Sequence, residues 1–149
     1  MTNHECIQPA ANRAVEPIRT LVVDDSPRWM ETLCAFLGNE PALVIGGTAR
    51  DGIEALGRVA TLQPALILLD VRMPRMDGLE TAALIRVRFP EMRILMMSLD
   101  DDSGTREACF AHGAHAFVGK SKGATELLPA IFRLFNMDAG AAQTASGAA

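Results

Sequence analysis

The segment LVVDDSP, at residues 21–27, ends an apolar run with two adjacent carboxylates. With the residues before it, IRTLVVD (18–24) is a short continuous apolar run rich in β-branched residues, which predicts a strand buried on both faces. Ser26 can cap a helix that starts at Pro27, because a missing N–H costs nothing at the first helical position. A buried strand therefore ends in two negative charges and passes directly into a helix.

Four further apolar segments predict the remaining strands of one sheet. They are ALVIGGT (42–48), ALILLD (65–70), MRILMMS (92–98) and HAFVG (115–119). Helical patterns alternate with these strands, so the strands should be parallel, with right-handed crossovers and helices on both faces. The predicted fold class is α/β, a three-layer flavodoxin-like (βα)5 sandwich with a parallel five-stranded sheet, for which the order 2-1-3-4-5 is suitable.

Capping residues predict where several helices begin. DGIEAL (51–56) and DGLETA (77–82) each place an Asp three residues before a Glu, the capping-box pattern in which the two side chains satisfy each other's free amide groups. The last helix runs through ELLPAIFRLF (126–135). With Thr125 as its cap, Pro129 falls in the first turn and removes at most one hydrogen bond.

Length and composition favour one folded domain. The chain has 149 residues, of which 49% are hydrophobic, and a net charge of −4 with scattered basic residues, which argues against direct nucleic-acid binding. It has no apolar run of membrane-spanning length and no signal-peptide core, so we expect a cytoplasmic protein without a membrane role. We expect a flexible N-terminal arm at 1–16, a folded domain at 17–136 and a disordered C-terminal tail at 137–149.

Five polar residues follow the ends of predicted strands, where ligands of such sheets gather. They are Asp24, Asp25, Asp70, Ser98 and Lys120. Three carboxylates in one crevice would repel one another unless a positive charge lies among them. Mg²⁺ prefers carboxylate, water and phosphate oxygens, so the adjacent pair of aspartates is best interpreted as half of a Mg²⁺ site.

Asp70 has the central place in this predicted site. A carboxylate beside Mg²⁺ can act as nucleophile on a phosphoryl group and form an acyl phosphate. Lys120, as a point charge, and Ser98, as a hydroxyl donor, are suited to hold the phosphoryl oxygens. Each residue alone has an ordinary interpretation, such as a helix cap or a solvated lysine, but their common position at strand ends favours one phosphoryl-transfer site.

Several segments resemble response regulator receiver domains, the phosphoacceptor part of two-component signalling. They are LVVDDSP, LILLDVRMPRMDGLE, ILMMS and GAHAFVGK, in the family's order, within a resemblance that covers about residues 17–136. The resemblance implies that Asp70 accepts a phosphoryl group from a histidine kinase, a histidine phosphotransfer protein or a small donor such as acetyl phosphate. It also implies that Asp25, assisted by Asp24, binds Mg²⁺ together with Asp70 and the backbone carbonyl of Arg72.

The resemblance assigns two further roles and shows one departure. Ser98 and Lys120 would bind phosphoryl oxygens, and Phe117 matches the aromatic switch that turns inward when the hydroxyl is drawn to the phosphate. Ser121 follows the lysine where many members have a cis proline. GAHAFVGKSKGATELLPAI resembles receivers of helix-turn-helix transcription regulators in particular, but residues 137–149 have no pattern of a DNA-binding domain. We expect a stand-alone receiver; the alternative is a receiver fragment of a DNA-binding regulator.

Arg72 and Asp100 should flank the mouth of the site, because they lie two residues after Asp70 and Ser98. A pair across the entrance could obstruct or misorder the water that hydrolyses the acyl phosphate, which predicts a long-lived phosphorylated state. The alternative is two solvated charges that never meet.

Two other functions are compatible with the same residues. A Mg²⁺-dependent phosphohydrolase would turn over an external phosphate ester, although its usual D-x-D motif is replaced here by D-D-S. A phosphorylation-independent interaction module would still bind its partner after Asp70→Asn. We expect no enzyme of this kind but a signalling protein that catalyses its own phosphorylation and dephosphorylation. Its partners would be the kinase or phosphotransfer protein and a downstream protein or a second copy of itself.

Overall fold

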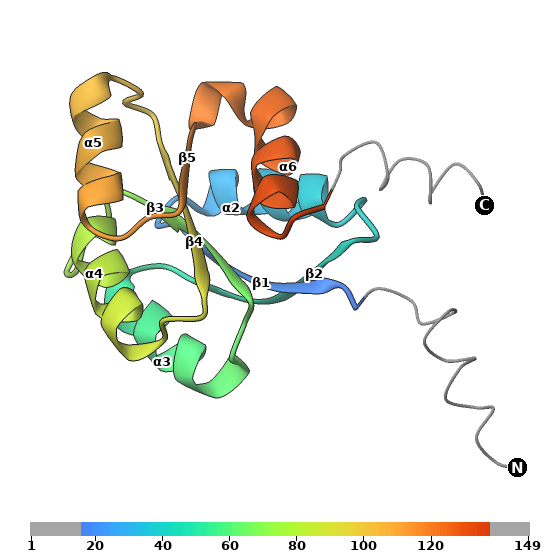
Figure 1. Cartoon of the computed structure of the whole chain (residues 1–149), viewed down its shortest axis with the longest axis horizontal. Helices are drawn as coiled ribbons and strands as arrows, with labels where there is room; N and C mark the ends of the chain where they lie inside the picture. The colour runs from blue at the N-terminus through green and yellow to red at the C-terminus, as the bar shows by residue number, and fades with distance from the viewer. Residues whose placement is uncertain (1–15, 138–149) are drawn as a thin grey trace, which may run out of the picture.

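Five parallel strands form the central sheet of this computed structural model, which describes residues 16–137 (Figure 1). The order is β2-β1-β3-β4-β5, so the predicted fold class and strand order are confirmed. Neighbouring strands pair in parallel throughout the sheet. The strands are β1 (Ile18–Val23), β2 (Leu43–Ala49), β3 (Leu66–Asp70), β4 (Arg93–Ser98) and β5 (Ala116–Gly119).

Helices cover both faces of the sheet, each with its own hydrophobic core. Alternate residues of a strand point to opposite faces, so Leu21 and Val23 pack toward one core and Val22 toward the other. One core includes residues of α3, α4 and α5, and the other includes residues of α2 and α6. The helices are α2 (Pro27–Leu37), α3 (Gly52–Leu62), α4 (Gly78–Arg88), α5 (Ser103–Ala111) and α6 (Gly123–Leu134), with a 3-10 turn η1 (Lys120–Lys122) before the last.

Side-chain caps fix the starts of the helices that follow the site loops. Ser26 Oγ accepts a hydrogen bond from the Trp29 N–H, and Pro27 is the first residue of α2, as predicted. Asp51 caps α3 through the Glu54 N–H at 2.9 Å. The predicted capping box is only half formed there, because the Glu54 carboxylate accepts from the N–H of Arg50 at 2.8 Å and not from that of the cap.

The predicted start of the last helix is wrong. Helix α6 begins at Gly123, directly after η1, so Pro129 lies inside the helix and not in its first turn. Thr125 is a helical residue whose hydroxyl donates to the Lys122 carbonyl at 3.3 Å. The proline removes one backbone bond, but Leu127 and Ile131 are fully buried beside it, and this burial outweighs the loss.

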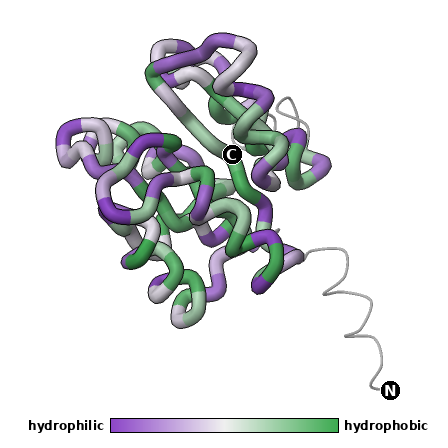
Figure 2. The backbone as a smooth tube through the Cα atoms, turned by 90° about the vertical axis from the view of Figure 1, so that its left-hand side faces the viewer, coloured by the Kyte–Doolittle hydropathy of each residue, from purple (hydrophilic) through white to green (hydrophobic). Residues whose placement is uncertain are grey.

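Figure 2 shows hydrophobic and hydrophilic stretches alternating along the chain, as expected when amphipathic helices pack one side on a sheet. Within residues 16–137, none of the helices has the length and apolar character needed to cross a bilayer. The predicted arm at 1–16 and tail at 137–149 lie outside the described residues, apart from Glu16 and Met137.

Candidate functional site

Three carboxylates meet where β1 and β3 end. Asp24 and Asp25 follow β1, and Asp70 is the last residue of β3, the strand paired with β1. Each offers an oxygen within 4.8 Å of the others. Asp24 and Asp70 are buried and Asp25 is exposed. The Asp24 carboxylate is held by the Ser26 N–H at 2.9 Å, so the loop that begins α2 also orients a carboxylate.

Lys120 brings a positive charge into this cluster from the end of β5. Its Nζ lies 2.7 Å from Asp24 Oδ2 and 3.4 Å from Asp70 Oδ1, and its side chain is only 8% exposed. The ammonium also lies over the Trp29 ring, 5.2 Å from its centroid. The indole therefore covers the side of the lysine that faces α2.

The environment of Asp70 favours the protonated carboxyl group. Burial is the main cause, and repulsion from Asp24 adds to it; the Lys120 ammonium opposes both. The pKa of Asp70 is raised from 3.8 to about 6. An added cation would favour the ionised, nucleophilic form of this carboxylate.

Ser98 and Phe117 come from the two strands on the other side of Asp70. Ser98 ends β4, the neighbour of β3, and its buried Oγ accepts from the Asp100 N–H at 3.0 Å. Phe117 lies on β5 and is 6% exposed. The Arg106 guanidinium covers its ring at 4.9 Å from the centroid.

A family model, the response regulator receiver domain, matches residues 20–132 of this sequence. The chain belongs to this family. The receiver domain is 39% identical over 119 residues to a protein-glutamate methylesterase/protein-glutamine glutaminase from Symbiobacterium thermophilum. That match covers 78% of this chain but 33% of the relative, so the chain spans about a third of the relative's length.

Solved structures of receiver domains are similar over most of the chain. The response regulator domain of CheB from Thermotoga maritima has a TM-score of 0.75 and 30% identity, with 83% of this chain and 99% of that one covered. A chain in the crystal structure of the CheX-CheY-BeF3-Mg²⁺ complex from Borrelia burgdorferi has a TM-score of 0.72 and 26% identity. The match covers 80% of this chain and 90% of that one.

The acidic cluster of this receiver domain fits Mg²⁺ by the chemistry of its donors. Its ligand atoms are carboxylate oxygens at short mutual distances, and the exposed Asp25 leaves a side of the cluster open to water and to a phosphoryl group. Asp24, Asp25 and Asp70 would hold the ion.

Arg72 and Asp100 form an ion pair at the entrance of the site, as the hypothesis of a slowed hydrolysis required. Arg72 Nη2 lies 3.1 Å from Asp100 Oδ2, and the two side chains are 78% and 52% exposed. The pair joins the loop after β3 to the loop after β4, and these loops directly follow Asp70 and Ser98. The geometry of this pair is present, but exposure limits its strength.

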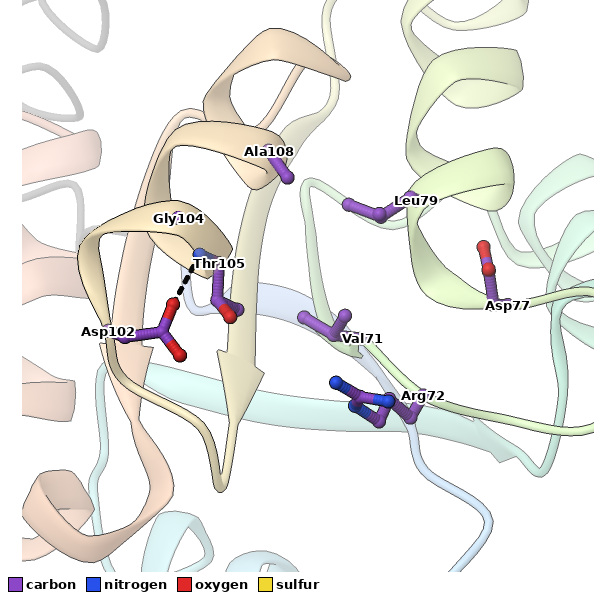
Figure 3. Close-up of a pocket in the computed structure, with 8 residues that line it drawn as sticks. All are labelled: Val71, Arg72, Asp77, Leu79, Asp102, Gly104, Thr105 and Ala108. Carbon is purple, nitrogen blue, oxygen red and sulfur yellow. Dashed lines mark hydrogen bonds between the residues drawn. The ribbon is translucent and has the colours of Figure 1, made fainter.

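A cavity of about 410 Å³ lies beside the acidic cluster, between the starts of α4 and α5 (Figure 3). Arg72 reaches it, and the Asp102 carboxylate on its wall accepts from the Thr105 N–H at 2.7 Å. The carboxylates Asp24, Asp25 and Asp70 do not line this cavity. The lining residues are Val71, Arg72, Asp77, Leu79, Asp102, Gly104, Thr105 and Ala108.

Three of the contacts that were not predicted concern the site and its neighbouring loops. They are the Trp29 ring beside Lys120, the ion pair between Arg75 and Asp51, and the pairing of Asp101 with Lys122 at 3.3 Å. Each joins segments far apart in sequence. The positive φ of Arg75 was equally invisible, because arginine has no preference for that conformation.

Proposed function

We propose that this receiver domain is a phosphoacceptor switch in which Asp70 takes a phosphoryl group from a histidine kinase or a histidine phosphotransfer protein. A carboxylate oxygen of Asp70 attacks the phosphorus, and the phosphorus–nitrogen bond of the phosphohistidine breaks with its electron pair left on the imidazole. The observation that carries the proposal is the buried Asp70 beside Asp24 and Lys120, next to an exposed carboxylate.

Mg²⁺, held by the three aspartates and the Arg72 carbonyl, would neutralise charge that develops on the phosphoryl oxygens. Lys120 lies within 3.4 Å of Asp70 and needs only a small movement to bind one of those oxygens. The hydroxyl of Ser98 accepts from a backbone N–H and still has its own hydrogen to donate to another oxygen. The similar CheX-CheY complex contains Mg²⁺ and supports this assignment.

Phosphorylation would change the conformation of β5 and of the adjacent helices α5 and α6. Donation by Ser98 would draw the loop after β4 toward Asp70, and Phe117 would respond to the shift of that loop. Its ring is already buried under Arg106, so this backbone accommodates the inward ring. The surface formed by α5, β5 and α6 would then bind a downstream protein or a second copy, without turnover of an external substrate.

Intact-mass spectrometry after incubation with acetyl phosphate tests the proposal. The wild type is expected to gain one phosphoryl group only when Mg²⁺ is present, because charge neutralisation is needed for transfer. Asp70→Asn should gain none, and Asp77→Asn, a helix-cap variant outside the acidic cluster, should gain as much as the wild type. An adduct that forms equally on Asp70→Asn, or without Mg²⁺, would contradict the proposal.

The Arg72–Asp100 pair should prolong the phosphorylated state. Exposed ion pairs contribute about 0.2–1 kcal/mol, so its loss in Arg72→Ala or Asp100→Ala should speed dephosphorylation by about 1.4- to fivefold. The measurement is decay of the phosphorylated mass after removal of the donor. Arg58→Ala, which breaks an exposed pair with Glu54 on α3, is the matched control. Equal decay rates in all four proteins would show that the pair does not affect the attacking water.

A further inference from the structure

The loop at residues 71–77 connects β3 to α4 and carries the Arg72 carbonyl. A backbone hydrogen bond joins its two ends. The Gly78 N–H donates to the Val71 carbonyl at 2.8 Å. A side chain at Gly78 would collide with the carbonyl oxygen of Asp70, so this close approach requires glycine. Backbone contacts therefore hold the start of α4 close to the end of β3.

An ion pair between Arg75 and Asp51 attaches the middle of the same loop to the start of α3. Arg75 has a φ of 68°, a left-handed conformation that non-glycine residues rarely adopt. Its Nε lies 3.0 Å from Asp51 Oδ2, and its Nη2 binds the same oxygen. The Asp51 side chain is 5% exposed although that of Arg75 is 64% exposed. A loop residue is thus attached to a buried carboxylate on the neighbouring helix.

A second contact lies directly beside the first. The Gly52 N–H donates to the Met76 carbonyl at 3.2 Å, and a side chain at Gly52 would collide with Thr81 and Met76. Asp51 Oδ1 meanwhile caps α3 through the Glu54 N–H. The start of α3 therefore supports the loop through two contacts. Asp51 both caps α3 and binds Arg75 of the loop.

We propose that the Arg75–Asp51 pair positions the Arg72 carbonyl for Mg²⁺, although neither residue belongs to the acidic cluster. A backbone carbonyl has no rotamers, so only the path of the chain can aim it. Arg75 is three residues from Arg72, and its strained φ is maintained by the bonds to Asp51. The inference rests on the proposed Mg²⁺-dependent function, and both residues are positioning residues.

Calorimetric titration with MgCl₂ tests the inference without any phosphoryl transfer. Arg75→Ala and Asp51→Asn should each weaken Mg²⁺ binding by about tenfold, because the loop loses its side-chain attachment to the start of α3. Asparagine can still cap α3, so Asp51→Asn isolates the ion pair from the cap. The double variant should bind no more weakly than either single variant, as expected for two partners of one interaction.

Two further variants separate the pair from other causes. Arg75→Gly relieves the positive φ but also removes the guanidinium, and it should bind Mg²⁺ as weakly as Arg75→Ala. Arg58→Ala removes an exposed arginine that pairs with Glu54 on α3 and should bind like the wild type. Thermal unfolding without Mg²⁺ checks that the variants are folded at the titration temperature.

The outcomes distinguish this inference from the proposed function. If Arg75→Ala and Asp51→Asn bind Mg²⁺ within twofold of a wild type whose binding is abolished by Asp25→Ala, the metal site stands and the inference is overturned. Restored affinity in Arg75→Gly would also overturn it, because backbone strain would then be responsible. If the wild type itself binds no Mg²⁺, the proposed metal site fails and the inference fails with it.

Discussion

Lys120→Met is expected to lower the free energy of unfolding of the metal-free domain by about 3 to 5 kcal/mol at neutral pH. The ammonium bridges Asp24 and Asp70 in a site where all three side chains are less than a tenth exposed. Removing one partner of a buried pair leaves uncompensated charge, which costs far more than the loss of a surface pair. Methionine keeps the apolar stem beside Trp29, so the loss reports mainly on the charge.

Chemical denaturation at several pH values, with and without Mg²⁺, measures this effect. The loss should shrink as the pH falls through about 6, the raised pKa of Asp70, because the protonated Asp70 needs no counter-charge. Mg²⁺ at about a hundred times its Kd should raise the free energy of unfolding of the variant by about 2.7 kcal/mol, because it binds the folded state preferentially. Lys122→Met, which removes a half-exposed lysine, is the control and should cost less than about 1 kcal/mol. Equal losses in the two variants would contradict the prediction.

Asp70→Asn should have the opposite effect and stabilise the metal-free domain at neutral pH. The pKa of Asp70 is raised to about 6 in the folded state, so the native protein binds this proton more tightly than the unfolded chain does. The stabilisation from this proton is complete below the unfolded value of 3.8 and is lost as the pH rises through about 6. A difference of this size corresponds to about 3 kcal/mol.

The amide cannot ionise, so Asp70→Asn avoids that loss. We expect the free energy of unfolding of Asp70→Asn to exceed that of the wild type by about 2 to 3 kcal/mol at about pH 7 to 8. Below about pH 4 the two proteins should be equally stable. Mg²⁺ should narrow the difference, because it stabilises the ionised carboxylate of the wild type. Asp25→Asn, at an exposed position, should gain less. A constant difference between pH 4 and pH 8 would show that repacking, and not titration, causes the stabilisation.

Local patterns in the sequence were sufficient for the fold and for the members of the acidic cluster. A strand buried on both faces must be apolar, so β1 and β3 are visible as short apolar runs, and their ends are marked by the first polar residues. Parallel strands bring those ends to one edge of the sheet, and the three carboxylates accordingly lie within 4.8 Å of one another. The same reasoning placed Arg72 and Asp100 at the mouth of the site and left open whether they meet, and in the structure they do.

Contacts that depend on how helices and loops approach one another could not be read from such patterns. The start of α6 was misplaced because η1 continues directly into the helix, and no local cap marks the junction. Lys120 was expected to face a phosphoryl group, but its contacts with Asp24 and with the Trp29 ring were not predicted. Arg75 reaches Asp51 across 24 residues of sequence. Strand-end chemistry follows from backbone periodicity, whereas these side-chain pairs exist only because packing two distant segments excludes water from one partner.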